Sequence, residues 1–157
     1  MVSSFKLNCD AALDSKGGIM GFGIIVRDWV GKVFTAKIFS QNGALEPTAA
    51  EAMAVFYGVK FCQENGLHKI IIESDANRVT TAIQNRGGKT CRFGHLMDDI
   101  LLILGSFPSE VRHVKRKANK AAHGLTRAAI KQVIDAIWVE EIPPCIRNIV
   151  LTEFSAL

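Results

Sequence analysis

Alternating apolar and polar residues at the start of the chain predict a first strand over residues 5–11. The next two runs, 19–27 and 32–41, are rich in Ile, Val and Phe and are separated by a short polar turn, which favours two more antiparallel strands. Three consecutive isoleucines at 70–72 are typical of a strand covered on both faces. A short alternating stretch at 111–115 predicts a fifth strand.

Apolar residues at helical spacing predict helices between and after these strands. The helices are expected to begin near Pro47, Asn77, Leu96, Asn119 and Ile146. The resulting order, given without the short final helix, is β-β-β-α-β-α-α-β-α and predicts an α/β domain with a mixed sheet flanked by helices. Because the sequence has no repeat, low-complexity tract or linker, we expect residues 1–157 to form a single domain.

Composition is consistent with one domain that has a full core, since the chain has 157 residues and 48% hydrophobic content. No stretch approaches the roughly 20 apolar residues of a membrane span, and the N-terminus lacks a signal-peptide pattern. We therefore expect a soluble, intracellular monomer without a membrane partner, in the nucleus or the cytoplasm, or a domain excised from a larger protein. The four widely spaced cysteines argue against a zinc site or a disulfide framework and predict buried thiols.

Positive charge is concentrated in one segment of the chain. Residues 111–131 carry seven Lys or Arg and no Asp or Glu, so the rest of the chain is net negative by three although the total is +4. A basic strip on a nearly neutral domain suits binding to a phosphate backbone, where each contact releases counterions. The alternative interpretation is a solvated helix face.

Three acidic residues occur where the predicted elements could bring them together. Asp10 lies on the first strand, Glu51 lies one turn into the first helix, and Asp75 follows the isoleucine strand at the crevice where open α/β sheets bind ligands. If the first and fourth strands are neighbours, the three carboxylates share one place and require a cation to offset their repulsion. Mg²⁺ prefers such oxygen ligands, and two ions about 3.5–4 Å apart would stabilise both oxygens of an in-line phosphoryl displacement.

Each of these acids also has an ordinary structural interpretation. Asp75 alternatively caps the helix that follows it, as Asp and Ser commonly do. Glu51 alternatively faces solvent from its helix, and Asp10 alternatively is an exposed strand residue. The sequence pattern favours a shared site only when the three are taken together.

Five short motifs in order resemble the ribonuclease H domain, specifically its plant retroelement-related, reverse-transcriptase-like branch. They are LNCDAAL, GGIMGFGIIVRD, TAAEAMAV, IIIESDANRV and VRHVKRKANKAAHGLTRAA. The likeness extends to the tail WVEEIPPCIRNIVL and implies the ribonuclease H-like fold, with a five-stranded sheet of three antiparallel strands followed by parallel ones. It also implies that Asp10, Glu51 and Asp75 are metal-binding acids. The implied reaction is cleavage of the RNA strand of an RNA/DNA hybrid with two Mg²⁺ or Mn²⁺ ions, leaving 5′-phosphate and 3′-hydroxyl ends.

The sequence departs from the family pattern at the fourth acid, which usually follows an Asn by four residues. Here Asn119 is followed at that spacing by His123. Imidazole suits softer ions such as Mn²⁺ better than Mg²⁺, so His123 is expected to weaken the second metal, shift metal preference or carry a proton, unless it only lines the helix. By ungapped position, His113 falls where the family has a mobile-loop His that assists turnover, although it is alternatively a strand residue.

The resemblance further implies how nucleic acid is held. Residues 86–92 are too few for the long basic protrusion that some relatives carry, so phosphate contacts are expected from the basic strip, at Arg112, Lys115, Arg116, Lys117 and Lys120. Contacts to RNA 2′-hydroxyls are expected from Ser74, Asn119 and the backbone of residues 10–12. Ser74 alternatively caps its helix.

Three functions are consistent with the sequence: an active hybrid nuclease, a binding module that has lost turnover, and a relative with different chemistry on the same fold. Retention of Asp10, Glu51 and Asp75 favours the nuclease, because a pure binder has no physical reason to keep three mutually repelling carboxylates together. His123 is the feature that supports the binding module.

Overall fold

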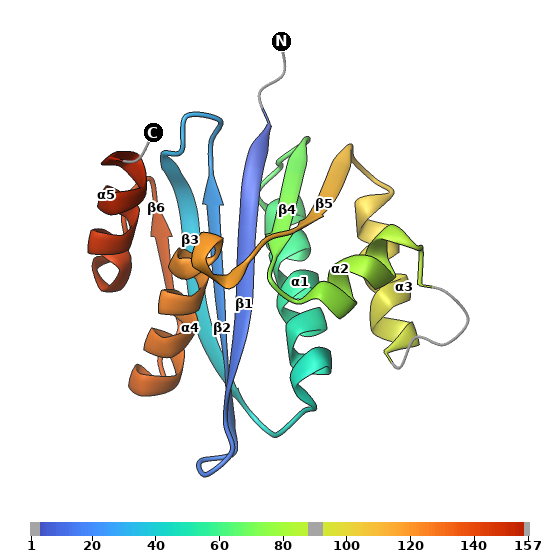
Figure 1. Ribbon diagram of the computed structural model, residues 1–157, viewed down its shortest axis with the longest axis horizontal. Coiled ribbons are helices and arrows are strands. Elements are labelled where there is room, and N and C mark those ends of the chain that lie inside the picture. The colour runs from blue at the N-terminus through green and yellow to red at the C-terminus, as the bar shows by residue number, and fades with distance from the viewer. Residues whose placement is uncertain (1–3, 88–92, 156–157) are drawn as a thin grey trace.

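A computed structural model describes residues 4–87 and 93–155 of the chain. Within these residues the strands form one six-stranded sheet in the order β5-β4-β1-β2-β3-β6 (Figure 1). The strands are β1 Phe5–Asp14, β2 Ile19–Arg27, β3 Val33–Asn42, β4 Ile70–Ser74, β5 Ser109–His113 and β6 Ala136–Val139. The helices are α1 Pro47–Glu64, α2 Asn77–Gln84, α3 Gly94–Leu104, α4 Lys120–Gln132 and α5 Arg147–Ser155, with 3₁₀ turns η1 Arg116–Ala118 and η2 Pro144–Ile146.

The sheet is mixed, as the sequence predicts. β1, β2 and β3 form an antiparallel meander, whereas β4 pairs in parallel with β1 on one side and with β5 on the other. Leu7 of β1 lies opposite Ile72 of β4, and Asn8 lies opposite Glu73. β1 and β4 are therefore neighbours, which is the condition under which Asp10 and the residue after β4 can share a site.

The sheet has one strand more than the five that the sequence predicts. β6 pairs antiparallel with β3, and the Thr35 hydroxyl donates to the Trp138 carbonyl at 2.8 Å. β6 is only four residues long, and Pro143 and Pro144 follow it closely. Proline cannot donate a backbone hydrogen bond to a sheet, so Pro143 and Pro144 made a strand in this part of the sequence unexpected. They lie after β6, in the turn into η2, and therefore limit the strand without excluding it.

Helices cover both faces of the sheet (Figure 1). On one face, α1, α2 and α3 pack with buried residues of β1 and β4, among them Leu7 and Ile72. On the other face, α4, η2 and α5 pack with residues of β2 and β3, among them Ile25 and Ile38. The core is consequently divided by the sheet, and α4 lies on the face opposite α1.

α4 lies close against β2 because glycines occur where the helix crosses the strand. A Cβ on Gly23 would lie 2.7 Å from the Ala122 carbonyl oxygen, and a Cβ on Gly21 would lie 2.8 Å from the Thr126 carbonyl oxygen. Gly23 is paired with Asp10 in the register of the sheet. The close packing therefore brings the first half of α4 over the part of β1 that carries Asp10.

Cys9 and Cys62 are buried as expected, whereas Cys145 is exposed. The prediction of a buried thiol is wrong at Cys145 because η2 turns only Ile146 into the core. Cys91, and most of the 86–92 segment on which the prediction of a compact fold rests, lie outside the described residues. Among the described helices, none has the length and apolar content needed to cross a bilayer.

Candidate active site

Three carboxylates from separate parts of the chain meet at one place. Asp10 comes from β1, Glu51 from the first turn of α1, and Asp75 directly follows β4. One ligand oxygen from each lies within 4.8 Å of the others. Asp10 is only 2% exposed, and Glu51 and Asp75 are half-buried. The exposed position considered for Asp10 is therefore wrong, and so is the solvent-facing position considered for Glu51.

The carboxylates strongly perturb one another. The pKa of Glu51 is raised from 4.5 to about 9, mainly by burial and then by the charge of Asp10, a hydrogen bond with Asp10 and the charge of Asp75. The pKa of Asp75 is raised by burial and by Asp10, and it is lowered less strongly by the guanidinium of Arg116. Without a cation, the cluster therefore keeps a proton near neutral pH.

Glu51 also has a buried oxygen, Oε2, without a hydrogen-bond partner in the described structure. A buried acceptor left unpaired is costly, and a bound cation would satisfy it. All three candidate ligands are carboxylate oxygens, which hard divalent ions such as Mg²⁺ and Mn²⁺ accept. The residues present therefore fit a divalent metal ion.

His123 adjoins this cluster from α4. Its Nδ1 lies 3.0 Å from Asp10 Oδ2, and the Thr126 hydroxyl lies 3.4 Å from the same oxygen. A guanidinium nitrogen of Arg116 lies 3.2 Å from the same Nδ1. One ring nitrogen cannot donate to a carboxylate and accept from Arg116 at once. Because a carboxylate only accepts and a guanidinium only donates, Asp10 and Arg116 make opposite demands on Nδ1.

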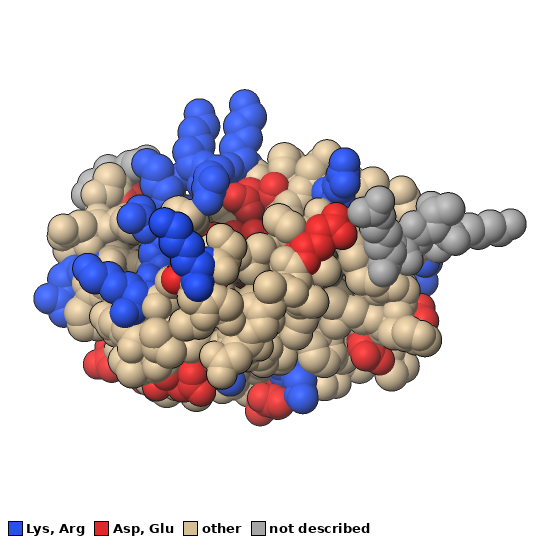
Figure 2. Space-filling view, turned by 90° about the horizontal axis from the view of Figure 1, so that it is seen from below, with Lys and Arg blue, Asp and Glu red and all other residues tan. Residues whose placement is uncertain are grey.

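The other predicted side chains on β5 and η1 are exposed. His113 ends β5, paired in the sheet register with Ser74, and Arg112 makes a two-pronged contact with Glu110 at 2.8 and 3.1 Å. The remaining basic candidates, Lys115, Arg116, Lys117 and Lys120, are also exposed. Figure 2 shows Lys and Arg side chains projecting from one face beside a recessed group of acidic residues.

Ser74 and Asn119 are predicted to contact RNA, yet the structure buries both and gives them intramolecular partners. Ser74 is 0% exposed, and its hydroxyl accepts a hydrogen bond from the Ala76 backbone at 3.1 Å. Asn119 is 1% exposed, and its amide donates to the Cys9 carbonyl at 3.1 Å. α2 has no side-chain cap, so the capping function considered for Asp75 is not observed.

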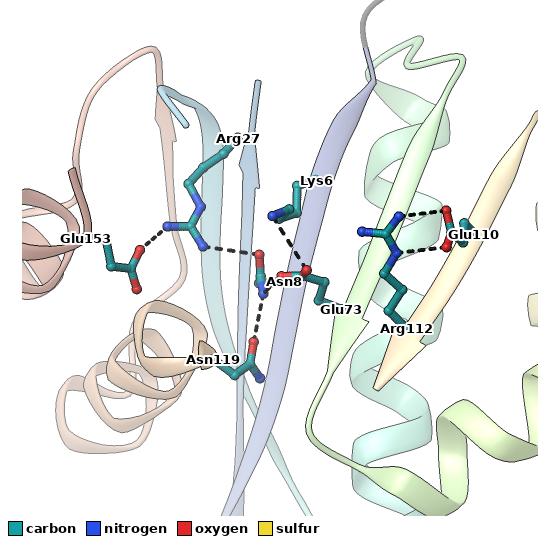
Figure 3. A network of polar contacts seen from close by, with 8 residues as sticks. All are labelled: Lys6, Asn8, Arg27, Glu73, Glu110, Arg112, Asn119 and Glu153. Carbon is teal, nitrogen blue, oxygen red and sulfur yellow. Dashed lines mark hydrogen bonds and ion pairs between the residues drawn. The ribbon is translucent and has the colours of Figure 1, made fainter. Parts of the chain in front are cut away.

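Several residues around the site escaped the sequence analysis. Asn8 lies two residues before Asp10 on β1, and its amide donates to Glu73 and Asn119 (Figure 3). Its alternation with Asp10 was a usable signal, because residues two apart on a strand share a face. Arg27 and Glu153 extend the same network, but they are 126 positions apart and give no local pattern.

Comparison with known proteins places the chain in a family. Residues 8–129 match a family model described as reverse transcriptase-like. No curated protein matches the sequence at a significant level. The N-terminal RNase H domain of Rv2228c from Mycobacterium tuberculosis, solved as a fusion with maltose binding protein, has a similar structure. It gives a TM-score of 0.74 at 16% identity and covers 84% of this chain and 96% of that chain.

Two further solved structures are similar at the same level. RNase H1 of the halophilic archaeon Halobacterium salinarum NRC-1 gives a TM-score of 0.74 at 17% identity, over 82% of this chain and 98% of that chain. LC11-RNase H1, solved in complex with an RNA/DNA hybrid, gives a TM-score of 0.72 at 17% identity, over 82% of this chain and 97% of that chain. At such identities the structures establish a common fold, whereas the family model spans most of the sequence. The chain therefore belongs to the reverse transcriptase-like family and has the ribonuclease H-like fold.

Proposed function

We propose that the protein is a metal-dependent nuclease that hydrolyses the RNA strand of RNA/DNA hybrids internally. The observation that carries this proposal is the convergence of Asp10, Glu51 and Asp75, with a buried Glu51 oxygen left unpaired. Three carboxylates so arranged are unfavourable by themselves and become favourable around divalent cations. The similarity to a ribonuclease H solved with an RNA/DNA hybrid supports the choice of substrate.

Asp10, Glu51 and Asp75 would hold two Mg²⁺ or Mn²⁺ ions. When bound, such ions polarise the phosphate and lower the pKa of the attacking water. Asp10 is the residue best placed to serve both positions, because it contacts Glu51 on one side and His123 on the other. Hydrolysis would leave a 5′-phosphate on one product and a 3′-hydroxyl on the other.

His123 would complete the second metal position with an imidazole nitrogen, exchanging its contact with Asp10 for one to the ion. An imidazole ligand favours Mn²⁺ over Mg²⁺ relative to a carboxylate. His113, exposed at the end of β5, would assist turnover by exchanging protons with the leaving product.

The substrate would be held by its phosphates against the basic residues of β5, η1 and the start of α4. These are Arg112, Lys115, Arg116, Lys117 and Lys120. Recognition of 2′-hydroxyls is assigned to the backbone of residues 10–12, beside the cluster. Ser74 and Asn119 stay predicted contacts, but each would exchange an intramolecular hydrogen bond for one to the sugar.

We assign the chain to the plant retroelement-related branch of the family on its five sequence motifs, and we take residues 1–157 as one domain that acts as a monomer.

The second candidate function is a binding module with little turnover. The observation that favours it is the imidazole of His123 beside Asp10, where the family pattern has a fourth carboxylate.

The test is cleavage of a labelled RNA/DNA hybrid by the purified protein with each metal. We expect internal cuts in the RNA strand, faster with Mn²⁺ than with Mg²⁺, and none in an Asp10→Asn variant. Asp14→Asn is the matched control, because Asp14 lies on the same strand and only accepts backbone hydrogen bonds from Lys16 and Gly17. Equal cutting of double-stranded RNA or DNA, or full activity in Asp10→Asn, would reject the proposal. Tight hybrid binding without cleavage would favour the binding module.

A further inference from the structure

The C-terminal segment beyond residue 129 lies outside the family match and contains β6 and α5. It adds a strand to the edge of the sheet next to β3 and packs Ile146 and Val150 against the same core cluster as α4. One of its side chains also reaches the end of β2, an inner strand of the sheet. Glu153 of α5 accepts from the guanidinium of Arg27 at the end of β2 (Figure 3).

From Arg27 the polar contacts continue toward the carboxylate cluster. Another guanidinium nitrogen of Arg27 donates to Asn8 Oδ1 at 3.2 Å. The Asn8 amide nitrogen donates to Asn119 Oδ1 at 3.1 Å and to Glu73 Oε1 at 3.0 Å. Figure 3 shows this path from α5 across β2 and β1 to the start of α4. Both ends of the Asn8 amide are thus used, so its orientation is fixed.

The path ends where β1 and α4 meet. The Asn119 amide donates to the carbonyl of Cys9, the residue before Asp10, at 3.1 Å. The backbone carbonyl of Asn119 accepts a hydrogen bond from the His123 backbone nitrogen at 3.1 Å. Asn119 therefore fastens the first turn of α4, which carries His123, to the strand that carries Asp10.

Burial gives these contacts their importance. Asn8 is 0% exposed and Asn119 is 1% exposed, and the Arg27 side chain is 12% exposed. A buried amide that loses one partner cannot replace it with bulk water, so it reorients and weakens its other bonds. Loss of Arg27 would release Asn8, and release of Asn8 would remove the partner that holds Asn119.

We propose that Arg27 and Glu153 are positioning residues, through which the C-terminal helix sets the distance between His123 and Asp10. The proposal rests on the proposed function, because it assigns these residues to the support of the same metal site. The competing explanation is that the Arg27–Glu153 pair only fastens α5 to the sheet. The two explanations differ in what they predict for the site when stability is controlled.

The first test replaces Arg27 by Met in the full chain, which keeps the length of the side chain and removes its donors. Three quantities are measured: the ring ¹H–¹⁵N spectrum of the histidines at fixed pH with chelator, Mn²⁺ affinity by calorimetry, and kcat and KM on hybrid. We expect the His123 signals to move while those of His68, on the loop before β4, do not. Mn²⁺ affinity and kcat should each fall about three- to tenfold, with KM unchanged, which is less than the roughly 10–100-fold typical of residues that contact a metal ligand directly.

Thr35→Val is the matched control. It removes the hydrogen bond from Thr35 to the Trp138 carbonyl and so loosens the same C-terminal segment without touching the path to Asn119. It should lower the melting temperature and leave the His123 signals and Mn²⁺ affinity unchanged. If Arg27→Met does not fold, Glu153→Gln serves instead, because the Glu153 side chain is 33% exposed and the amide of Gln keeps one acceptor oxygen for Arg27. Glu153→Gln is expected to shift the His123 signals and to lower Mn²⁺ affinity and kcat in the same direction as Arg27→Met, but by less.

A charge exchange, Arg27→Glu with Glu153→Arg, separates the two explanations. It restores an ion pair to α5 but places a carboxylate, which only accepts, against the acceptor oxygen of Asn8. We expect the melting temperature to recover and the defects in Mn²⁺ affinity and His123 signals to persist. Recovery of both, or unchanged His123 signals in Arg27→Met, would overturn the proposal. Failure of the unmodified chain to cut hybrid would reject the nuclease function alone, since the spectral and Mn²⁺ measurements do not require turnover.

Discussion

Glu51 lies in an environment far from that of an ordinary carboxyl, since its pKa rises from 4.5 to about 9 through burial and the neighbouring carboxylates. An acid with a raised folded-state pKa contributes stability that is present at low pH. The contribution is lost as pH rises between about 4.5 and 9, because the unfolded chain releases its proton first. The metal-free protein should therefore lose stability across this window, by at most about 1.4 kcal/mol per pH unit.

Replacing Glu51 by Gln removes this titration and keeps the shape of the protonated side chain. We expect Glu51→Gln to be more stable than the unmodified protein in chelator, with a difference that grows from pH 5 to pH 9. The free energy of unfolding from denaturant titrations at several pH values measures it. Glu110→Gln is the control, because Glu110 is exposed beside Arg112. A stability difference that shrinks with rising pH would contradict the assignment of the proton to Glu51.

His123 is the second residue at which the site can be tested singly. Replacement by Asp supplies a fourth carboxylate beside Asp10 and a harder ligand for Mg²⁺. We expect Mg²⁺-supported hybrid cleavage by His123→Asp to rise about tenfold, which corresponds to about 1.4 kcal/mol of transition-state stabilisation. His123→Asn, similar in size but uncharged, should show no such rise. A fall by orders of magnitude in His123→Asp would instead identify the imidazole as a working catalytic group.

At the scale of elements, the site depends on how closely α4 approaches the sheet. A Cβ on Gly23 would meet backbone atoms of α4, with the Ala122 carbonyl oxygen at 2.7 Å and the Thr126 nitrogen at 2.8 Å. Backbone cannot rotate away as a side chain can, so the helix must move. We expect Gly23→Ala to destabilise the protein by about 1–3 kcal/mol and to reduce cleavage by separating His123 from Asp10.

Thermal unfolding and hybrid cleavage measure the two effects of Gly23→Ala. Gly94→Ala is the control, because a Cβ at Gly94 has no atom within 4 Å and alanine is favoured in a helix. It should leave both quantities unchanged or raise stability slightly. Full stability and activity in Gly23→Ala would show that α4 can shift without affecting the site.

The elements also explain what could be predicted from the sequence. The isoleucine run of β4 and the apolar–polar alternation of β1 were enough to predict both strands, and with them the places of Asp10 and Asp75. The alternation does not report that Asn8 and Asp10 are as buried as Leu7 and Cys9. β6 was missed because four residues before two prolines give too short a pattern. The burial of Asn119 was missed for another reason. The hydrogen bond between Asn8 and Asn119 joins residues 111 positions apart, which no local periodicity reports.

At the scale of the whole molecule, charge is segregated although the total is only +4. The basic residues of η1 and its flanks lie on the face that also carries His123 and Asp10, with Arg116 contacting His123 directly. Figure 2 shows Lys and Arg side chains gathered beside a group of acidic side chains. A duplex held by its phosphates on this surface would therefore lie over the carboxylates, which only divalent cations could then make compatible with a polyanion.

The salt dependence of hybrid binding tests this arrangement. Lys115 and Lys117 are exposed on either side of the first residue of η1, and each phosphate contact contributes about 0.9 to the slope of log K against log salt. In an Asp10→Asn background, Lys115→Ala with Lys117→Ala should weaken binding and flatten the slope by about 1.8. Lys60→Ala with Lys69→Ala is the control: both side chains are exposed. Lys60 lies nine residues after Glu51 on α1, which is about two and a half turns further along and on the opposite side of the helix. An unchanged slope in the first pair, or an equal change in both, would place the hybrid on another surface.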